Sequence, residues 1–164
     1  MARMLLVTAL MAAITVPLAG AADPPSDGTL SVKRGRGALV LKLKGTVIGR
    51  VKNGRVQIRD FRPLDTNDPK ITCPRNRIRH VGAGIWICKG RNISFRVDDA
   101  RFNVNVRGSG IWISAVGRGP GTVDGAGDEG FADGVMSIDD APYTSLPDTL
   151  MSFFLGTPPP TPRR

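Results

Sequence analysis

Apolar and polar residues alternate along much of the chain between residues 28 and 116. In residues 101–107, Phe102, Val104 and Val106 fall on one side of an extended chain, and polar residues fall on the other. Successive side chains of a strand point to opposite faces, so this period of two is typical of a half-buried β-strand. No segment shows a sustained helical period. The pattern therefore predicts an all-β protein.

Glycine-containing motifs interrupt the alternating segments. Gly-Xaa-Gly followed by an apolar run occurs three times, at residues 35–37, 82–84 and 108–110. Because glycine reaches positive φ without steric cost, each copy predicts a bend between two strands. Asn53-Gly54, flanked by valines, predicts a two-residue type I′ hairpin. The copies start 47 and then 26 residues apart, which does not suit a fixed-period solenoid.

The length between the chain ends suits one domain with its own core. We expect residues 29–156 to fold as a single antiparallel β-sandwich or Greek-key barrel of about 8–10 short strands.

Both ends of the chain predict segments outside this domain. Residues 1–22 predict a signal peptide, because Arg3 precedes an apolar stretch that ends in small residues suited to cleavage. An uncleaved membrane anchor is the alternative. Residues 23–28 are expected to be a linker, and residues 157–164, with four prolines, a disordered tail. We therefore expect an exported protein, secreted or in the cell envelope, with no membrane span after cleavage.

Cysteine content agrees with export. Cys73 and Cys88 are the two cysteines of the chain, and in an oxidising compartment they predict one disulfide. A metal site is the rival interpretation, but two cysteines and the single histidine, His80, fall short of the four ligands of structural zinc. We expect no metal or cofactor.

Charge is distributed unevenly along the chain. Residues 28–119 hold 20 Lys and Arg against five Asp, whereas residues 120–162 hold seven acids and no base. A basic face could bind a polyanion such as nucleic acid, teichoic acid or acidic polysaccharide. Alternatively, the bases are the solvent side of half-buried strands, and the acidic third folds back and neutralises part of them. The candidate polyanion-binding residues are Lys42, Lys44, Arg55, Arg59, Arg77 and Arg79.

Trp86 and Trp112 occupy equivalent positions after two of the glycine motifs. In a strand each would face away from its flanking isoleucines, so both could form an exposed platform on which sugar rings stack. The alternative, which we favour from the sequence, is that both are buried packing residues.

Catalytic signals are weak. His80 lies among arginines, no Gly-Xaa-Ser-Xaa-Gly motif is present, and Asp98-Asp99 and Asp139-Asp140 are expected to cap turns. The acids of residues 124–140 do not follow the EF-hand order. The sequence predicts no catalytic residue and a protein that is not an enzyme.

Several segments resemble small exported bacterial β-rich proteins of uncharacterised function. The resemblance rests on glycine-turn motifs in residues 107–125, on Asp133-Gly134 and on residues 152–156, about a third of the chain. It implies export and a compact β domain, and it assigns no binding or catalytic residue. Residues 45–58 are similar to one rung of bactofilin-like β-helical proteins, but an export signal does not suit a cytoskeletal filament.

These observations lead to one expected function and two alternatives. We expect an exported, non-enzymatic β module with a structural or protein-interaction role in the envelope or extracellular space. The first alternative is a polyanion- or glycan-binding module that uses a basic face of residues 30–119. The second is a hydrolase, which would need a cleft that brings His80 beside an acidic loop.

Overall fold

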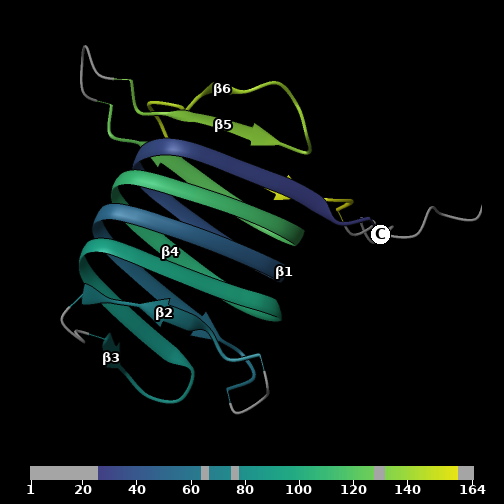
Figure 1. The fold of residues 1–164 in the computed structure, drawn as a ribbon. Helices are drawn as coiled ribbons and strands as arrows, with labels where there is room; N and C mark the ends of the chain where they lie inside the picture. The colour runs from purple at the N-terminus through teal and green to yellow at the C-terminus, as the bar shows by residue number, and fades with distance from the viewer. Residues whose placement is uncertain (1–25, 64–66, 75–77, 128–131, 159–164) are drawn as a thin grey trace, which may run out of the picture.

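The computed structural model describes residues 26–63, 67–74, 78–127 and 132–158. Every helix or strand element in these residues is a strand, which confirms the all-β prediction (Figure 1). The predicted signal peptide, the end of the predicted tail and Arg77 lie outside the described residues. Seven strands form one sheet: β1 (Gly28–Asp60), β2 (Lys70–Thr72), β3 (Ile78–His80), β4 (Ile85–Gly125), β5 (Val135–Ile138), β6 (Thr144–Ser145) and β7 (Met151–Leu155).

Two strands dominate the fold. β1 has 33 residues and β4 has 41, in place of the many short strands that we expected. They pair with each other antiparallel in two registers, so that Leu39 lies beside Val106 on one edge and Val123 on the other. These β4 partners are 17 residues apart, which is the length of one turn of a coil. The two-stranded ribbon therefore winds round so that each turn hydrogen-bonds to the next.

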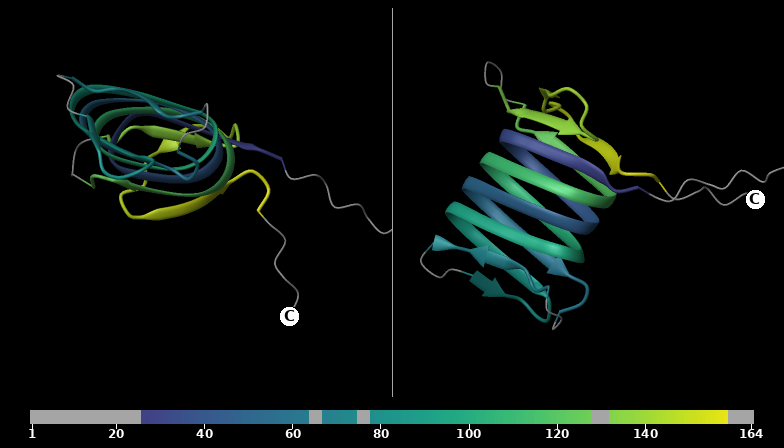
Figure 2. Two further views of the ribbon diagram at one scale, coloured as in Figure 1. Left: turned by 90° about the horizontal axis from the view of Figure 1, so that it is seen from below. Right: turned by 45° about the vertical axis from the view of Figure 1, so that its right-hand side comes forward.

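The coil is a flattened tube rather than a round one. Seen from below, its turns form nested ovals, and from the side they form a stack (Figure 2). The two broad faces of the oval are the two layers of a sandwich, and both layers are made by the same two strands. The front face, toward the viewer in Figure 1, comprises residues 28–36, 46–53, 91–98 and 109–116 with β2 and β5; the back face comprises the intervening segments with β3 and β7.

Alternation of side chains fills the tube. Leu41 and Leu43 in β1 and Phe102 and Val104 in β4 are buried, whereas Lys42 and Asn103 between them face outward. Such burial of aliphatic and aromatic side chains is the main favourable term in the stability of a fold of this size. The period of two in the sequence thus gives the core directly.

Glycines mark the two narrow edges of the oval, where each strand passes from one face to the other. They recur every eight or nine residues. The first crease consists of Gly125, Gly37, Gly108, Gly54 and Gly90, which pair in that order across the strands. The second crease consists of Gly28, Gly117, Gly45 and Ala100, again in pairing order.

Close approach of the backbones explains the glycines at the creases. Gly54 and Gly108 are partners, and a Cβ on either would lie well inside van der Waals contact of a carbonyl oxygen on the other strand. Gly108 also has a φ of 152°, which side chains disfavour. Only glycine therefore fits where two crease backbones approach as closely as Gly54 and Gly108 do.

One prediction about a turn is wrong. Asn53-Gly54 forms no hairpin but lies inside β1, because Gly54 keeps partners on both sides and the chain bends without reversing. The bends expected at the Gly-Xaa-Gly motifs of residues 35–37 and 108–110 are present, since Gly37 and Gly108 lie at the first crease, but they occur within long strands. Residues 82–84 alone connect two strands, β3 and β4, closed by a bond from the Val81 amide to the Ile85 carbonyl.

The ends of the tube are closed by short elements. At one end, a disulfide joins Cys73, beyond β2, to Cys88 in β4, as predicted. At the other, β5 and β6 extend the sheet from β1. The first and last described segments meet, because the Thr157 amide donates to the Ser26 carbonyl at 3.1 Å. No helix long and apolar enough to cross a membrane occurs in the described part of the chain.

We expect Gly108→Ala to lower the free energy of unfolding by about 3 kcal/mol, because the new Cβ meets a carbonyl oxygen at a strained φ. Gly90→Ala is the matched control at the same crease, since its Cβ would meet only Pro74 atoms at 3.9 Å or more. Urea denaturation of both variants measures the difference. An equal decrease in the free energy of unfolding in Gly108→Ala and Gly90→Ala would show that close backbone approach does not explain the need for glycine at the crease.

We expect removal of the disulfide to cost about 3 kcal/mol in the chain-entropy account, because it closes a loop with a sequence separation of 15. Thermal unfolding of Cys73→Ser/Cys88→Ser should show a lower midpoint than the oxidised protein. Dithiothreitol should lower the midpoint of the wild type and leave that of the variant unchanged. An unchanged wild-type midpoint after full reduction would contradict the expectation.

Candidate anion-binding groove at the first crease

A groove of about 720 Å³ runs along the first crease. Its floor is formed by the crease glycines, so bare backbone is accessible from outside. Side chains one position from the glycines line its two walls. The lining residues are Arg36, Gly37, Ala38, Asn53, Gly54, Arg55, Lys89, Gly90, Arg107, Gly108, Ser109, Asp124, Gly125 and Ala126.

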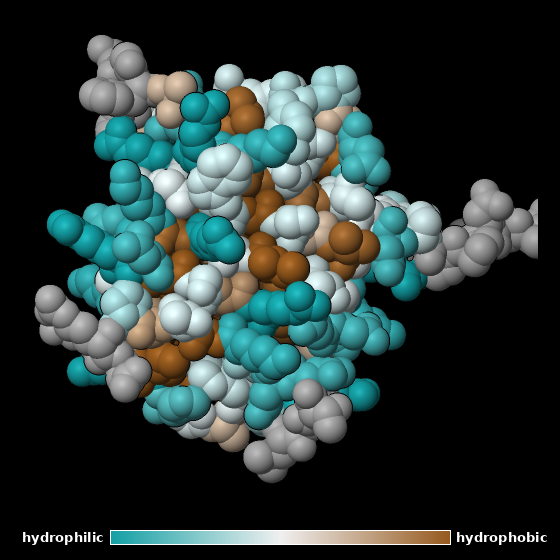
Figure 3. All heavy atoms as spheres, viewed as in Figure 1, coloured by the Kyte–Doolittle hydropathy of each residue, from teal (hydrophilic) through white to brown (hydrophobic). Residues whose placement is uncertain are grey.

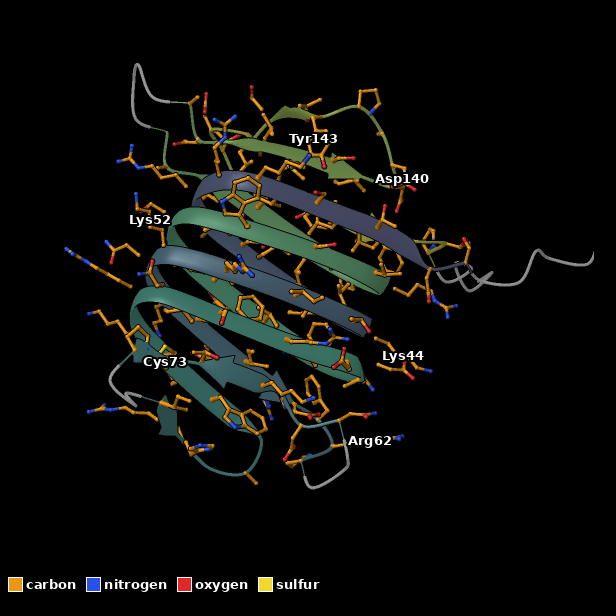
Figure 4. All side chains as sticks on the ribbon, viewed as in Figure 1. Lys44, Lys52, Arg62, Cys73, Asp140 and Tyr143 are labelled. Carbon is orange, nitrogen blue, oxygen red and sulfur yellow. A yellow bond between two sulfur atoms is a disulfide. The ribbon has the colours of Figure 1, made fainter. Side chains whose placement is uncertain are left out.

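Three cations lie side by side on one wall of this groove. Arg55 of β1 lies directly opposite Lys89 on one edge and Arg107 on the other. All three side chains are exposed. Neighbouring strands are about 4.8 Å apart, so this cation ladder (Lys89, Arg55 and Arg107) presents a positive group roughly every 5 Å across the strands. Nitrogen-tipped side chains project from this side of the tube around Lys52 (Figure 4).

The cation ladder is not neutralised from within the described chain. Arg55 donates through Nη2 to Gln57 Oε1 at 3.1 Å, a neutral partner. None of the three forms an ion pair with a residue that the structure describes. Like charges directly opposite each other destabilise a sheet. The ladder thus carries an electrostatic cost that nothing in the fold requires.

The opposite wall supplies hydrogen-bonding groups. In cross-strand order it consists of Arg36, Ser109 and Asn53. The Arg36 amide donates to the Asp133 carbonyl at 2.8 Å, which fixes the end of this wall beside β5. Asp124 closes the same end of the ladder wall, where it lies opposite Ala38. The groove is therefore basic along most of its length and acidic at one end.

The second crease differs in its charges. Arg101, Lys44 and Arg118 are also neighbours there, but Arg118 Nε lies 3.4 Å from Asp27 Oδ1. The Arg101 guanidinium lies 5.4 Å from the centre of the Phe61 ring. A hollow at this edge is lined by three acids, Asp27, Asp139 and Asp140. An anion would therefore favour the first crease.

Among the described acids of residues 120–162, Asp124 lines the groove, whereas Asp139 and Asp140 make structural contacts elsewhere. Asp139 Oδ1 accepts a hydrogen bond from the Thr29 amide at 2.9 Å, and Asp140 Oδ1 accepts one from the Thr29 hydroxyl at 3.0 Å. Both carboxylates fix the loop after β5 to the start of β1. They act at one end of the tube, away from the ladder.

The structure does not gather the predicted basic residues on one face. Arg55 alone belongs to the groove, and Lys44 lies at the second crease. Lys42 and Arg59 are on the back face, on opposite sides of Asn103, and Arg79 is exposed on β3. The single basic face is a wrong prediction, because the bends of β1 and β4 distribute alternating residues over two faces and two edges.

Sequence reasoning missed Lys89 and Arg107. Both precede a glycine, in Lys89-Gly90 and Arg107-Gly108, and Arg55 follows one. A search for cations beside glycines one coil turn apart could have found them. Their shared cross-strand neighbour, Arg55, is set by the register between β1 and β4, which no local sequence pattern reveals.

The two tryptophans occupy different environments. Trp112 is 46% exposed on the front face, so its prediction as a buried packing residue is wrong. Trp86 is half-buried, lies opposite the buried Ile58 and contacts His80 edge-on with ring centres 5.9 Å apart. Side chains alternate between inward and outward at both positions of β4. This alternation directs Trp86 inward, near the end of the tube, and Trp112 outward.

The remaining candidate chemical groups have structural partners. His80 is exposed beside Trp86. Arg96 Nε donates to both carboxylate oxygens of Asp98 at 2.7 Å, and this bond lowers the pKa of Asp98. Among the described residues, no three His, Cys, Asp or Glu side chains gather as metal ligands.

Comparison of the chain with protein-family models, curated proteins and solved structures finds no match.

If the ladder is electrostatically costly, Arg55→Glu should raise the free energy of unfolding by about 0.5 kcal/mol, because the new carboxylate would lie between Lys89 and Arg107. Arg79→Glu is the control with the same charge change, since Arg79 lies opposite the neutral Ile87. Urea denaturation at low salt compares them. A gain that is equal in both variants would reflect net charge and not the ladder.

Proposed function

We propose that the protein is a non-enzymatic module that binds a linear polyanion in the groove at the first crease. The observation that carries the proposal is the cation ladder: three exposed, unneutralised cations placed directly beside one another above a floor of glycine backbone. A folded protein tolerates such repulsion where a ligand relieves it, because charge-assisted bonds to phosphate, sulfate or carboxylate are strong.

The shape of the groove selects a polymer over a small anion. Its cations recur across successive strands, so a chain with regularly spaced anionic groups would contact several at once. The glycine floor lets such a chain approach the backbone, and Ser109 and Asn53 on the opposite wall can donate further hydrogen bonds. Arginine suits this role because its planar guanidinium binds two oxygens together.

The place of action follows from the sequence. The predicted signal peptide and the disulfide suit a protein that works in the envelope or outside the cell, where polyanionic polymers are abundant binding partners. The alternative of a purely structural or protein-interaction module predicts no dependence of binding on the ladder.

We expect Arg55→Gln/Lys89→Gln/Arg107→Gln to weaken binding of long-chain polyphosphate and to reduce its salt dependence. Each neutralised phosphate contributes about 0.7 to the slope of log K against log salt, so three lost contacts should lower that slope by about 2. Fluorescence anisotropy with labelled polyphosphate across a salt series measures both effects.

Lys42→Gln/Arg59→Gln/Arg79→Gln is the matched control, because it removes the same net charge from outside the groove. It should leave most of the slope intact. An equal loss of polyphosphate affinity in the two triple variants would show diffuse attraction to net charge. Binding that does not depend on salt would favour the protein-interaction module. Either result overturns the proposal.

A further inference from the structure

The front face carries a second surface feature that the groove does not use. Four large apolar or aromatic side chains are exposed there or at its upper border: Ile48, Trp112, Val116 and Tyr143. Figure 3 views this face and shows brown and pale residues across its centre with teal residues among them, and further teal residues at its left and right margins. The centre of the front face is thus less polar than the creases.

Two adjoining hollows of about 530 and 450 Å³ cross this centre and share Ser31 and Ser114. The strand register places Ser137, Ser31 and Ser114 in one line across β5, β1 and β4. Ser31 and Ser114 form a hydroxyl-bearing floor, whereas Ser137 is buried and its hydroxyl donates to the Ala141 carbonyl. We call the combined hollow the serine trough. Its bulkier lining residues are Lys33, Ile48, Arg50, Trp112, Val116, Asp140 and Tyr143.

Charged side chains accompany both aromatic walls of the serine trough. Arg50 lies directly opposite Trp112 on the neighbouring pass of β1. Lys33 Nζ lies 3.9 Å from the centre of the Tyr143 ring, and the Tyr143 hydroxyl is 2.8 Å from Ser31 Oγ. Interaction with Lys33, and next with Ser31, lowers the pKa of Tyr143. Tyr143 is therefore fixed in place before any ligand arrives.

We propose that the serine trough binds a carboxylated pyranose unit of a polysaccharide, with the ring stacked on Trp112. An exposed indole offers a flat apolar surface to the C–H face of a sugar ring. Serine hydroxyls can both donate to and accept from sugar hydroxyls, as the polar floor of the trough allows. Lys33 and Arg50 supply the charge that a carboxylate requires.

The chemistry of the trough favours a sugar over a protein partner. Its apolar side chains stand singly between serines and cations, whereas a protein-binding patch presents contiguous apolar area. A sugar ring has the same mixture of apolar faces and polar edges. This inference is independent of the proposed function, since the trough and the groove at the first crease share no lining residue.

Tryptophan fluorescence tests the proposal directly, because Trp86 and Trp112 are the two tryptophans of the chain. In Trp86→Phe, the emission reports Trp112 alone. Titration with oligogalacturonate should shift and quench this emission, and a neutral dextran oligomer of equal length should bind more weakly. Oligogalacturonate is also a linear polyanion that the groove could bind, so its comparisons with dextran are made in the Arg55→Gln/Lys89→Gln/Arg107→Gln background, which lacks the cation ladder. In that background, calorimetry with added Trp112→Ala should show affinity for oligogalacturonate lower by about tenfold or more.

Two further variants assign the roles of the walls. Lys33→Gln/Arg50→Gln should remove the preference for oligogalacturonate over dextran while circular dichroism stays unchanged. Arg55→Gln/Lys89→Gln/Arg107→Gln should keep the Trp112 response, because it alters the other site. An unperturbed Trp112 emission at saturating oligogalacturonate, or tighter binding of a mononucleotide than of the oligosaccharide, would overturn this inference and leave polyphosphate binding at the groove unaffected.

Discussion

Close contact between two glycine backbones at each crease is the constraint on which the structure depends. Where Gly54 meets Gly108, and where Gly45 meets Gly117, no Cβ fits between the strands. The hydrogen-bonded ladder can therefore follow a sharp bend without interruption. Two long strands then make both layers of a sandwich, which other β-sandwiches assemble from many strands and connecting turns.

The same constraint places the candidate site. A residue next to a crease glycine lies at the edge of the oval, and its neighbours across the strands come from turns of the coil that are distant in sequence. Lys89, Arg55 and Arg107 become adjacent in this way. The broad front face, by contrast, has moderate curvature and room for small side chains such as Ser31 and Ser114. The edge of the oval thus presents charged side chains, whereas the front face presents a surface on which a ring can stack.

Several features were predictable because their signals are local. The alternation of residues 101–107 predicts strand and core, and the two cysteines predict their bond. The hairpin predicted at Asn53-Gly54 does not form. The local preference of these two residues for a turn is weaker than the strand pairing that β1 makes on both of its edges. The burial of Trp112 was predicted wrongly because Trp86 and Trp112 occupy equivalent positions in their glycine motifs but different positions in the tube. The motif does not show whether another part of the chain packs against the side chain.

By itself, the sequence determined that the chain forms strands, that alternate residues of a segment such as 101–107 face the interior, and which cysteines join. These properties depend on each residue and its immediate neighbours. Only the tertiary structure decided that two strands coil into a tube, that glycines one coil turn apart stack into a crease, and that Lys89, Arg55 and Arg107 share a wall. The reason is that the register between β1 and β4 joins residues up to 89 positions apart, as for Gly28 and Gly117, and is fixed by the summed fit of all turns together.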